Sequence, residues 1–518
     1  MAELNPVNFS MILTSAFTNY NNQRMINIPE IKRQVLLNID REAFEKVRKS
    51  AQKDKDFVGG YAFEISNAVL KSDIRMYKRE IYAFNGIYYE QFDVAVFHNM
   101  LIEVLLEMNV GYGLLVKNNI DVVDFCKKRL IQKDINPTRT MIPFNNYVLD
   151  TTNMITYPHT STLDTLYALN YDYDPDANCP LWEKFLGEVL PGDGLISILQ
   201  EYLGLLFVDR DKLKLEKMLI LYGSGANGKS VVFETIYGIL GEQNISVYDM
   251  SQLTRGKSSE ANLADIDGKM LNYSSELDPH DFSGDIVKRL ISGEPIQARK
   301  LYKDPMQLKI IPLFIANANE LPETSDRTKA FFRRVLIIPF NVTIEEKKQD
   351  KALSTKLRKE YSGILNWILE GTQRIMQRGI NFTESKIVDK TIEEYKIIQD
   401  SVYGFVFVNK LLPSVEEGAE MYFVTNNELY KQYEKYCNDV TKKPYGKNRF
   451  LQIFKTHGFK SYSGAERGFV VYCSRKPEDY WNFDIGSIYD DENYHSLVPE
   501  KIPESEFEMM PVQGDIPF

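Results

Sequence analysis

The feature that most constrains this chain is one glycine-rich octapeptide, Gly223-Ser224-Gly225-Ala226-Asn227-Gly228-Lys229-Ser230. It matches every fixed position of the phosphate-loop pattern G-x-x-x-x-G-K-[ST], so an accidental glycine-rich turn is improbable. An apolar run over residues 217–222 predicts a buried strand before it, and apolar residues at helical spacing over 231–237 predict a helix after it. The glycines let backbone N–H groups face a triphosphate, and the helix dipole adds positive charge. The sequence therefore predicts a nucleoside triphosphate site in which Lys229 reaches the β- and γ-phosphates and Ser230 holds Mg²⁺.

The length of 518 residues is too great for one core, so we expect several domains. The patterns along the chain divide it into an N-terminal domain of unclear role over 1–98, a helical domain over 99–215, an α/β ATPase core over 216–345, a helical closing segment over 346–400, a winged-helix-like domain over 401–476 and an acidic tail over 477–518.

The net charge of −10 is concentrated at one end of the chain. Residues 477–518 contain eleven acidic side chains and one basic one, Lys501, so residues 1–476 are formally neutral. A neutral body with local basic patches can bind nucleic acid. No apolar run approaches the length of a membrane span, and four widely separated cysteines make no metal-type pair. We therefore expect a protein of a reducing, cytoplasmic compartment.

A second expected strand, over residues 269–276, ends in the carboxylate of Glu276. A phosphate-loop ATPase needs an acid at the end of a neighbouring strand to position Mg²⁺ and polarise the attacking water. Glu276 is the candidate for both roles, with Asp278 as a second acid nearby. Ser275 stands where many such enzymes carry an aspartate, so the metal is expected to rest mainly on Ser230. A solvated glutamate at a strand end is the alternative interpretation.

A third expected strand, over residues 308–316, is followed by two asparagines. Asn319 is the preferred residue, and Asn317 the second choice, for a hydrogen bond to the γ-phosphate or the lytic water. Arg333 and Arg334 then precede a further strand. An arginine projected at a neighbour's γ-phosphate neutralises charge during transfer, although paired arginines are more often surface salt bridges.

A hairpin with a basic tip is expected over residues 296–308. Arg299, Lys300, Tyr302 and Lys303 surround its turn and can grip a nucleic-acid backbone, since such contacts need charge rather than base identity. A solvated basic turn explains the pattern equally well.

These elements together resemble the ATPase of superfamily 3 DNA helicases, in particular the helicase part of phage, plasmid and poxvirus primase-helicases. The resemblance runs from the phosphate loop through Ser275-Glu276, residues 288–294, 298–305 and 319–322 to Arg333-Arg334, and upstream through residues 144–150, 171–175 and 180–182. It implies an AAA+-like core and a ring, usually a hexamer, with ATP bound between subunits. It also implies 3′ to 5′ translocation on single-stranded DNA and a bacterial host cell. In that ring Lys229, Ser230, Glu276 and Asn319 would act within one subunit and Arg333 or Arg334 on the next. No paired-carboxylate motif precedes the helical domain, so a helicase without primer synthesis is expected.

Local patterns predict two elements near the N-terminus. Residues 31–53 are expected to form one charged helix, and residues 75–98 a hairpin that turns at Asn85-Gly86.

The pattern over residues 401–476, helices followed by a final strand, suggests a winged helix. Its basic residues are clustered: Lys442, Lys443, Lys447, Arg449 and Lys455. Such a domain binds DNA or, nearly as well, protein. The terminus Asp515-Ile516-Pro517-Phe518 resembles the tip of bacterial single-stranded-DNA-binding proteins, which implies docking on host replication proteins.

The sequence leaves two alternatives to a replicative helicase. One is an initiator or loader, an origin-binding ATPase that melts DNA without processive unwinding. The other is an adaptor that uses nucleotide as a structural switch. Intact Lys229, Glu276 and the arginine pair argue against the adaptor.

Overall fold

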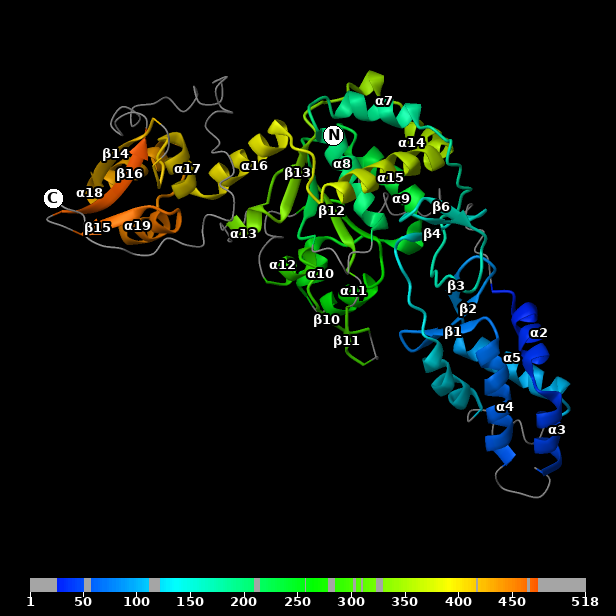
Figure 1. Cartoon of the computed structure of the whole chain (residues 1–518). Coiled ribbons are helices and arrows are strands. Elements are labelled where there is room, and N and C mark those ends of the chain that lie inside the picture. The colour runs from blue at the N-terminus through cyan, green and yellow to red at the C-terminus, as the bar shows by residue number, and fades with distance from the viewer. Residues whose placement is uncertain are drawn as a thin grey trace, which may run out of the picture.

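The structure, a computed structural model, forms three bodies in a row along an elongated molecule (Figure 1). We call residues 26–135 the N-terminal body, residues 136–399 the central core and residues 400–473 the C-terminal body. The residues that the structure describes are 26–50, 57–110, 122–208, 215–256, 258–277, 285–300, 304–308, 311–322, 329–415, 418–463 and 466–473.

The N-terminal body is built from helices around a small antiparallel sheet. Its named elements are α2 (Ile28–Asn38), α3 (Arg41–Ser50), α4 (Phe57–Lys71), β1 (Ile74–Tyr77), β2 (Glu80–Phe84), β3 (Tyr89–Gln91), α5 (Val94–Glu107) and the 3₁₀ turn η1 (Ile131–Lys133). The single helix expected over 31–53 is wrong, because the chain breaks at Ile39-Asp40. The side chain of Asp40 accepts a hydrogen bond from the amide of Ala43, which starts a new helix there.

Two tight turns shape the three-stranded sheet. The expected turn at Asn85-Gly86 is confirmed: Gly86 has a φ of 100° and the Asn85 side chain accepts bonds from two following amides. An earlier turn at Lys78-Arg79 was not predicted from the sequence, and both residues have positive φ, as a two-residue hairpin turn requires. Lys and Arg seldom occupy such positions, which is why the pattern gave no signal.

The segment before the strand that leads into the glycine-rich loop is only partly helical. The prediction of a mainly helical segment over 99–215 is therefore wrong. A meander of three short strands, β4 (Met141–Pro143), β5 (Val148–Asp150) and β6 (Ile155–Tyr157), comes before α7 (Pro180–Val189), α8 (Leu195–Gly204) and the 3₁₀ turn η2 (Leu205–Phe207). Strands of three residues are too short to show an alternating pattern. The predicted proline at the first turn of α7 is confirmed.

The central core contains a five-stranded parallel sheet in the order β13-β7-β12-β9-β8. Its strands are β7 (Met218–Tyr222), β8 (Ile245–Ser246), β9 (Leu271–Ser274), β12 (Leu313–Ala318) and β13 (Val335–Pro339). The helices between them are α9 (Lys229–Leu240), α10 (Met250–Thr254), α11 (Ser259–Asp265), α12 (Asp285–Ile291) and α13 (Lys329–Phe332), with the 3₁₀ turn η4 (Glu242–Asn244) before β8.

The strands expected around the glycine loop are present with shifted bounds. β9 spans Leu271–Ser274 rather than residues 269–276, so Glu276 follows the strand instead of ending it. β8 was not predicted, because two residues carry no pattern. β12 begins at Leu313 rather than at residue 308, since Pro312 cannot donate a ladder hydrogen bond, and it continues through Asn317.

Buried side chains cover both faces of this sheet, so the core is a three-layer α/β sandwich. Alternate residues of β7 divide between two apolar clusters: Leu219 and Leu221 pack with α8 and α9, and Met218 and Ile220 pack with α10 to α12. A strand buried on both faces is expected for a parallel sheet.

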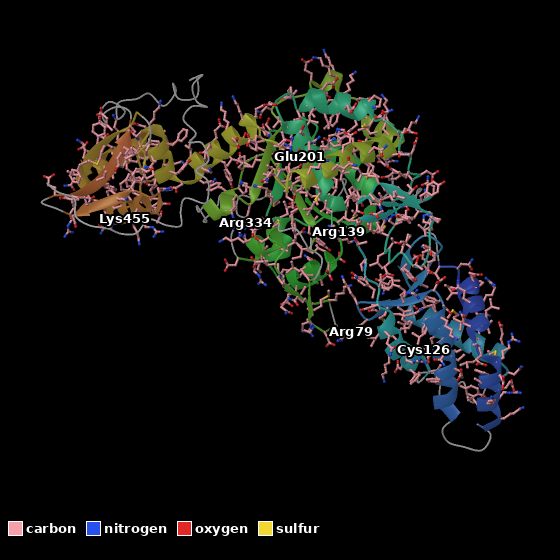
Figure 2. The ribbon with its side chains drawn as sticks, viewed as in Figure 1. Arg79, Cys126, Arg139, Glu201, Arg334 and Lys455 are labelled. Atoms are coloured by element: carbon pink, nitrogen blue, oxygen red, sulfur yellow. The ribbon has the colours of Figure 1, made fainter. Side chains whose placement is uncertain are left out.

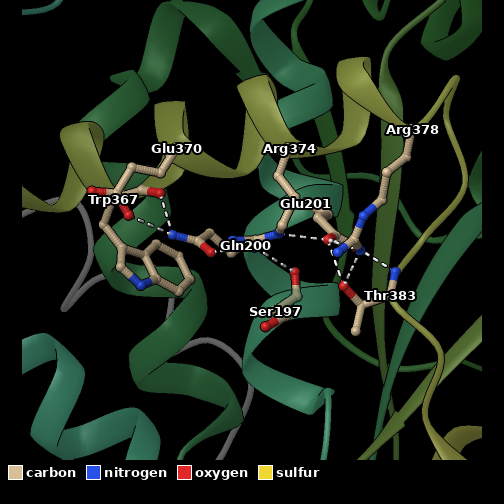
Figure 3. A network of polar contacts seen from close by, with 8 residues as sticks. All are labelled: Ser197, Gln200, Glu201, Trp367, Glu370, Arg374, Arg378 and Thr383. Carbon is tan, nitrogen blue, oxygen red and sulfur yellow. Dashed lines mark hydrogen bonds and ion pairs between the residues drawn. The ribbon is translucent and has the colours of Figure 1, made fainter.

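The expected helices after the sheet are confirmed as α14 (Leu353–Leu357), α15 (Tyr361–Gln377) and α16 (Lys386–Gln399), with two 3₁₀ turns, η5 (Glu346–Lys348) and η6 (Arg358–Glu360). α15 lies along α8, and the two helices are joined by a polar network around Glu201 (Figure 3). Glu201 is fully buried and accepts bonds from Arg374 at 2.7 Å and from the amide of Thr383 at 2.7 Å. The network fastens the segment before β7 to the closing helices.

The C-terminal body has the element order α17 (Ser401–Val408), β14 (Glu420–Thr425), α18 (Asn426–Asp439), α19 (Lys447–Thr456), β15 (Lys460–Ser463) and β16 (Arg467–Cys473). Its strands form an antiparallel sheet in the order β14-β16-β15. The expected cap is confirmed, because the Thr425 hydroxyl accepts a bond from the amide of Glu428. Two helices followed by a hairpin agree with the expected order of elements.

None of the helices in the described parts of the chain is long and apolar enough to cross a membrane. Residues 477–518, the acidic tail of the sequence analysis, lie outside the described residues.

Candidate functional site

Three strand ends meet at the carboxyl edge of the parallel sheet. Ala318 of β12 pairs with Tyr222 of β7, and Ala316 pairs with Ser274 of β9. The residues that follow these strands therefore lie beside one another, although they are up to a hundred positions apart in the sequence. Ligands of open parallel α/β sheets bind at this edge.

The loop between β7 and α9 follows a path that its glycines permit. Gly225 and Gly228 have φ of 99° and 93°. A Cβ atom on Gly223 would lie 2.4 Å from both the carbonyl oxygen of Phe340 and the Asn227 amide nitrogen. That Asn227 side chain is buried and donates to the Phe340 carbonyl at 3.1 Å, which anchors the loop to the chain after β13.

Lys229 is the first residue of α9 and is 5% exposed. Its ammonium donates to the carbonyl of Gly223 and, at 3.4 Å, to Oδ1 of Asn319. Burial lowers the pKa of Lys229, and the charge of Glu276 opposes that shift. Burial deprives this ammonium of hydration, and its two acceptors are neutral. A bound anion would stabilise the positive charge and offset the lost hydration.

Asn319 connects the lysine to the carboxylate. Its Nδ2 donates to Oε1 of Glu276 at 3.3 Å, so Lys229, Asn319 and Glu276 form one chain of contacts. Glu276 and Asn319 are both exposed, as is Ser230 at the start of α9. The predicted residues Lys229, Asn319 and Glu276 are thus brought together, and Asp278 lies outside the described residues.

Asn317, the second choice of the sequence analysis, has a different environment. Its side chain donates to the hydroxyl of Tyr273, whose ring stacks on Phe233 of α9 with 3.5 Å between centroids. Asn317 therefore ties β12 to β9 within the sheet, and Asn319 is the asparagine that contacts Lys229.

The arginine pair lies at the opposite edge of the sheet. Arg334 immediately precedes β13, and its carbonyl accepts a bond from the amide of Met218, where β7 begins. Five strand residues separate the pair from the carboxyl edge, a distance of roughly 16 Å. The side chain of Arg333 is 62% exposed and that of Arg334 is 12% exposed. Arg334 lies on the flank of the core where α13 lies (Figure 1 and Figure 2).

The predicted hairpin is present as β10 (Gln297–Ala298) and β11 (Met306–Gln307), which pair antiparallel. Arg299 and Lys300, directly after β10, are exposed. Tyr302 and Lys303, at the predicted tip, lie outside the described residues.

A metal ion at the carboxyl edge would need ligands from outside the protein. Ser230 and Glu276 can supply one oxygen ligand each. No cluster of three His, Cys, Asp or Glu side chains suited to a metal occurs among the residues with described positions. Mg²⁺ commonly takes one or two protein oxygens and completes its octahedron with phosphate oxygens and water, so this donor set fits Mg²⁺ bound with a nucleotide.

Two contacts, one at the arginine pair and one at the glycine loop, could not be predicted from the sequence. Glu216 forms an ion pair with Arg333 at 2.9 Å, and a Cβ atom on Gly228 would lie 3.0 Å from Phe185 and Val189 of α7. Each contact joins residues distant in the sequence, and neither leaves a local pattern.

Comparison with known proteins gives partial matches. Residues 221–334 match the DUF5906 family, a family of unknown function, and residues 115–191 match the D5_N family, described as D5 N terminal like. Putative helicase L207/L206 of Acanthamoeba polyphaga mimivirus is 28% identical over 215 residues, which are 37% of this chain and 22% of that protein. The match thus spans about a fifth of the viral protein's length.

Among solved structures, two apo structures of the C-terminal region of NrS-1 are similar at a distance. One is 12% identical, covers 77% of this chain and 96% of that chain, and has a TM-score of 0.43. The other is 15% identical, covers 61% and 80%, and has a TM-score of 0.41. The D5-type match and the viral relative confirm the resemblance to phage- and virus-type primase-helicases that the ordered motifs indicated.

Proposed function

We propose that this chain is an ATP-dependent replicative DNA helicase of a phage or mobile genetic element, which acts as a hexameric ring on single-stranded DNA. The observation that carries the proposal is the chain of contacts Lys229–Asn319–Glu276 at the carboxyl edge, with the arginine pair at the opposite edge. We assign the first three residues to ATP hydrolysis within one subunit and the arginines to the site of a neighbouring subunit.

In this mechanism Lys229 and the backbone N–H groups of residues 223–230 hold the triphosphate, and binding replaces the carbonyl and amide contacts of the lysine. Ser230 and Glu276 would provide protein ligands for Mg²⁺, and the bound ion would neutralise negative charge on the triphosphate. Glu276 orients the attacking water. Asn319 contacts both Glu276 and Lys229 and so fixes their positions relative to each other.

The position of the arginines supports hydrolysis between subunits. Arg333 and Arg334 lie where the parallel strands begin, and the glycine-rich loop lies where they end. Their guanidinium groups therefore cannot reach the loop of the same chain across the length of β13. They can reach a nucleotide that lies in the interface with an adjacent copy, where a guanidinium stabilises charge during phosphoryl transfer. Arg333 is the better candidate, because its side chain is 62% exposed and that of Arg334 is 12% exposed.

The β10–β11 hairpin is the proposed contact with one DNA strand, through Arg299, Lys300, Tyr302 and Lys303. Charge rather than base identity suffices for a channel that follows any sequence. The C-terminal body is proposed to be a winged-helix domain, and the terminal Asp515-Ile516-Pro517-Phe518 to dock on host replication proteins. Deletion of those four residues should weaken recovery of such proteins in pull-downs.

The test is unwinding of a forked duplex with ATP and Mg²⁺. The proposal expects strand separation by the native chain and none by Lys229→Ala, with Lys184→Ala as the matched control because Lys184 is 73% exposed on α7. ATP turnover that persists in Lys229→Ala would mean that the site is misassigned.

An origin-binding initiator or loader is the second candidate. The observation that favours it is that two basic residues of α19, Arg449 and Lys455, are exposed; Lys455 is labelled in Figure 2. Footprinting on candidate origin DNA separates the two: a sequence-specific footprint without forked-duplex unwinding identifies an initiator.

A further inference from the structure

Glu216, two residues before β7, is shared by both arginines that precede β13. Its Oε2 atom lies 2.9 Å from Nη2 of Arg333 and 3.6 Å from Nη2 of Arg334. Two guanidinium groups therefore face one carboxylate, and the three side chains together carry one net positive charge. Without the carboxylate, two adjacent like charges would repel each other.

The three side chains differ in how firmly they are held. Arg334 is 12% exposed and also donates from Nε to the hydroxyl of Ser292 at 3.0 Å. Arg333 is 62% exposed, and its guanidinium is held by the ion pair to Glu216. Glu216 itself is 21% exposed, so its charge is partly shielded from solvent.

The backbone around the pair is anchored to the same strand. Lys217 donates from Nζ to the carbonyl of Arg333 at 2.8 Å, and the amide of Met218 donates to the carbonyl of Arg334 at 2.9 Å. The segment Glu216-Lys217-Met218 thus holds both arginines by backbone and side chain. β7 carries this segment at one end and the glycine loop at the other.

We propose that Glu216 is a positioning residue, which holds the Arg333 guanidinium outward for the nucleotide of an adjacent subunit. The inference rests on the proposed function. Ordering a mobile arginine during hydrolysis costs side-chain conformational entropy. A carboxylate that orders the arginine beforehand lowers this entropic cost in the transition state.

Glu216→Gln keeps the shape of the side chain and removes its charge. It should lower kcat for ATP about fivefold, as expected for a partly exposed ion pair, and leave KM nearly unchanged. That split separates positioning from nucleotide binding, because a defect in the glycine loop would raise KM.

The decisive experiment mixes two inactive variants in assembled rings. A donor chain with Lys229→Ala has a dead site and supplies Arg333, and an acceptor chain with Arg333→Ala has an intact site and supplies none. Turnover then arises only where an acceptor site faces a donor arginine. Glu216→Gln is placed either in the donor or in the acceptor, and native mass verifies that both mixtures form the same assemblies.

With Glu216→Gln in the donor, we expect turnover about fivefold below the unmodified mixture, and no loss with the same change in the acceptor. Equal loss in both mixtures would show that Glu216 supports the strand of its own chain, and no loss in either would also overturn the inference. If the unmodified mixture recovers no turnover although mixed assemblies form, the shared site of the proposed function is itself wrong.

Discussion

The ammonium of Lys229, at the start of α9, lies 3.4 Å from the side-chain oxygen of Asn319, which follows β12 ninety positions later in the chain. The parallel register of β7 and β12 produces this contact, because it aligns Tyr222 with Ala318. The glycine-rich loop and the residues that follow β12 are therefore parts of one site.

The first prediction separates the two asparagines. Asn319→Ala should lower kcat for ATP about a hundredfold, since it removes the residue that joins Lys229 to Glu276. Asn317→Ala should retain turnover and lower the free energy of unfolding by about 1–3 kcal/mol, because the buried hydroxyl of Tyr273 loses a partner. Steady-state phosphate release and thermal unfolding of both variants measure these effects. The reverse outcome would exchange the two roles.

The second prediction concerns the basic hairpin. Lys303→Ala should leave basal ATP turnover intact and abolish its stimulation by single-stranded DNA, because the lysine is proposed to contact the strand rather than the nucleotide. Lys351→Ala, an exposed lysine distant in sequence from the hairpin, is the matched control. A normal response of Lys303→Ala to DNA would contradict the channel role.

The third prediction tests the polar network between α8 and α15. Glu201 is fully buried and pairs with Arg374 at 2.7 Å and Arg378 at 3.4 Å (Figure 3). Glu201→Ala leaves these charges without their buried partner and should destabilise the core by about 3–5 kcal/mol. The measurement is denaturant unfolding followed by tryptophan emission, since Trp182 and Trp367 pack edge to face beside the network.

Glu188→Ala is the surface control for this variant, because the Glu188 side chain is 64% exposed on α7. It should change stability by less than about 0.5 kcal/mol. Equal effects of the two substitutions would show that the network contributes little.

The fourth prediction is a pH dependence in the C-terminal body. Burial alone would raise the pKa of Asp400, but its hydrogen bonds to His457 and to two amides of α17 outweigh burial and lower it below the ordinary 3.8. A carboxyl whose pKa is lower in the folded state stabilises above its unfolded pKa, and this contribution is lost as pH falls through the folded value. Asp400→Asn should therefore weaken hydrogen-exchange protection of residues 401–408 at pH 6.

The same comparison repeated toward pH 3 completes the test. The difference in protection between the native chain and Asp400→Asn should shrink below about pH 4, after correction for intrinsic exchange rates. A difference that stays constant, or grows as the pH falls, would contradict the assignment.

Much of the candidate site could be predicted from the sequence, because its residues sit at strand ends that local pattern locates. Glu276 and Asn319 follow β9 and β12, and parallel strands bring their carboxyl ends to one edge. The choice between Asn317 and Asn319 needed the structure. The strand was expected to end at residue 316, but β12 continues to Ala318, so Asn317 lies inside the sheet.

Other features left no local signal. Glu216 becomes the partner of Arg333 only through the pairing of β7 with β13. The three-residue strands between Met141 and Tyr157 are too short for periodicity, and the turn at Lys78-Arg79 uses residues that rarely adopt positive φ. In each case tertiary contacts decide the local conformation.

The most direct test of the shared site is ATP turnover per chain, measured across a range of protein concentrations together with native mass. We predict that turnover per chain rises in step with assembly, and that Arg333→Ala forms the same assemblies without that rise, since its sites lack a neighbour's guanidinium. Full turnover by a monomer, or by assembled Arg333→Ala, would contradict the account.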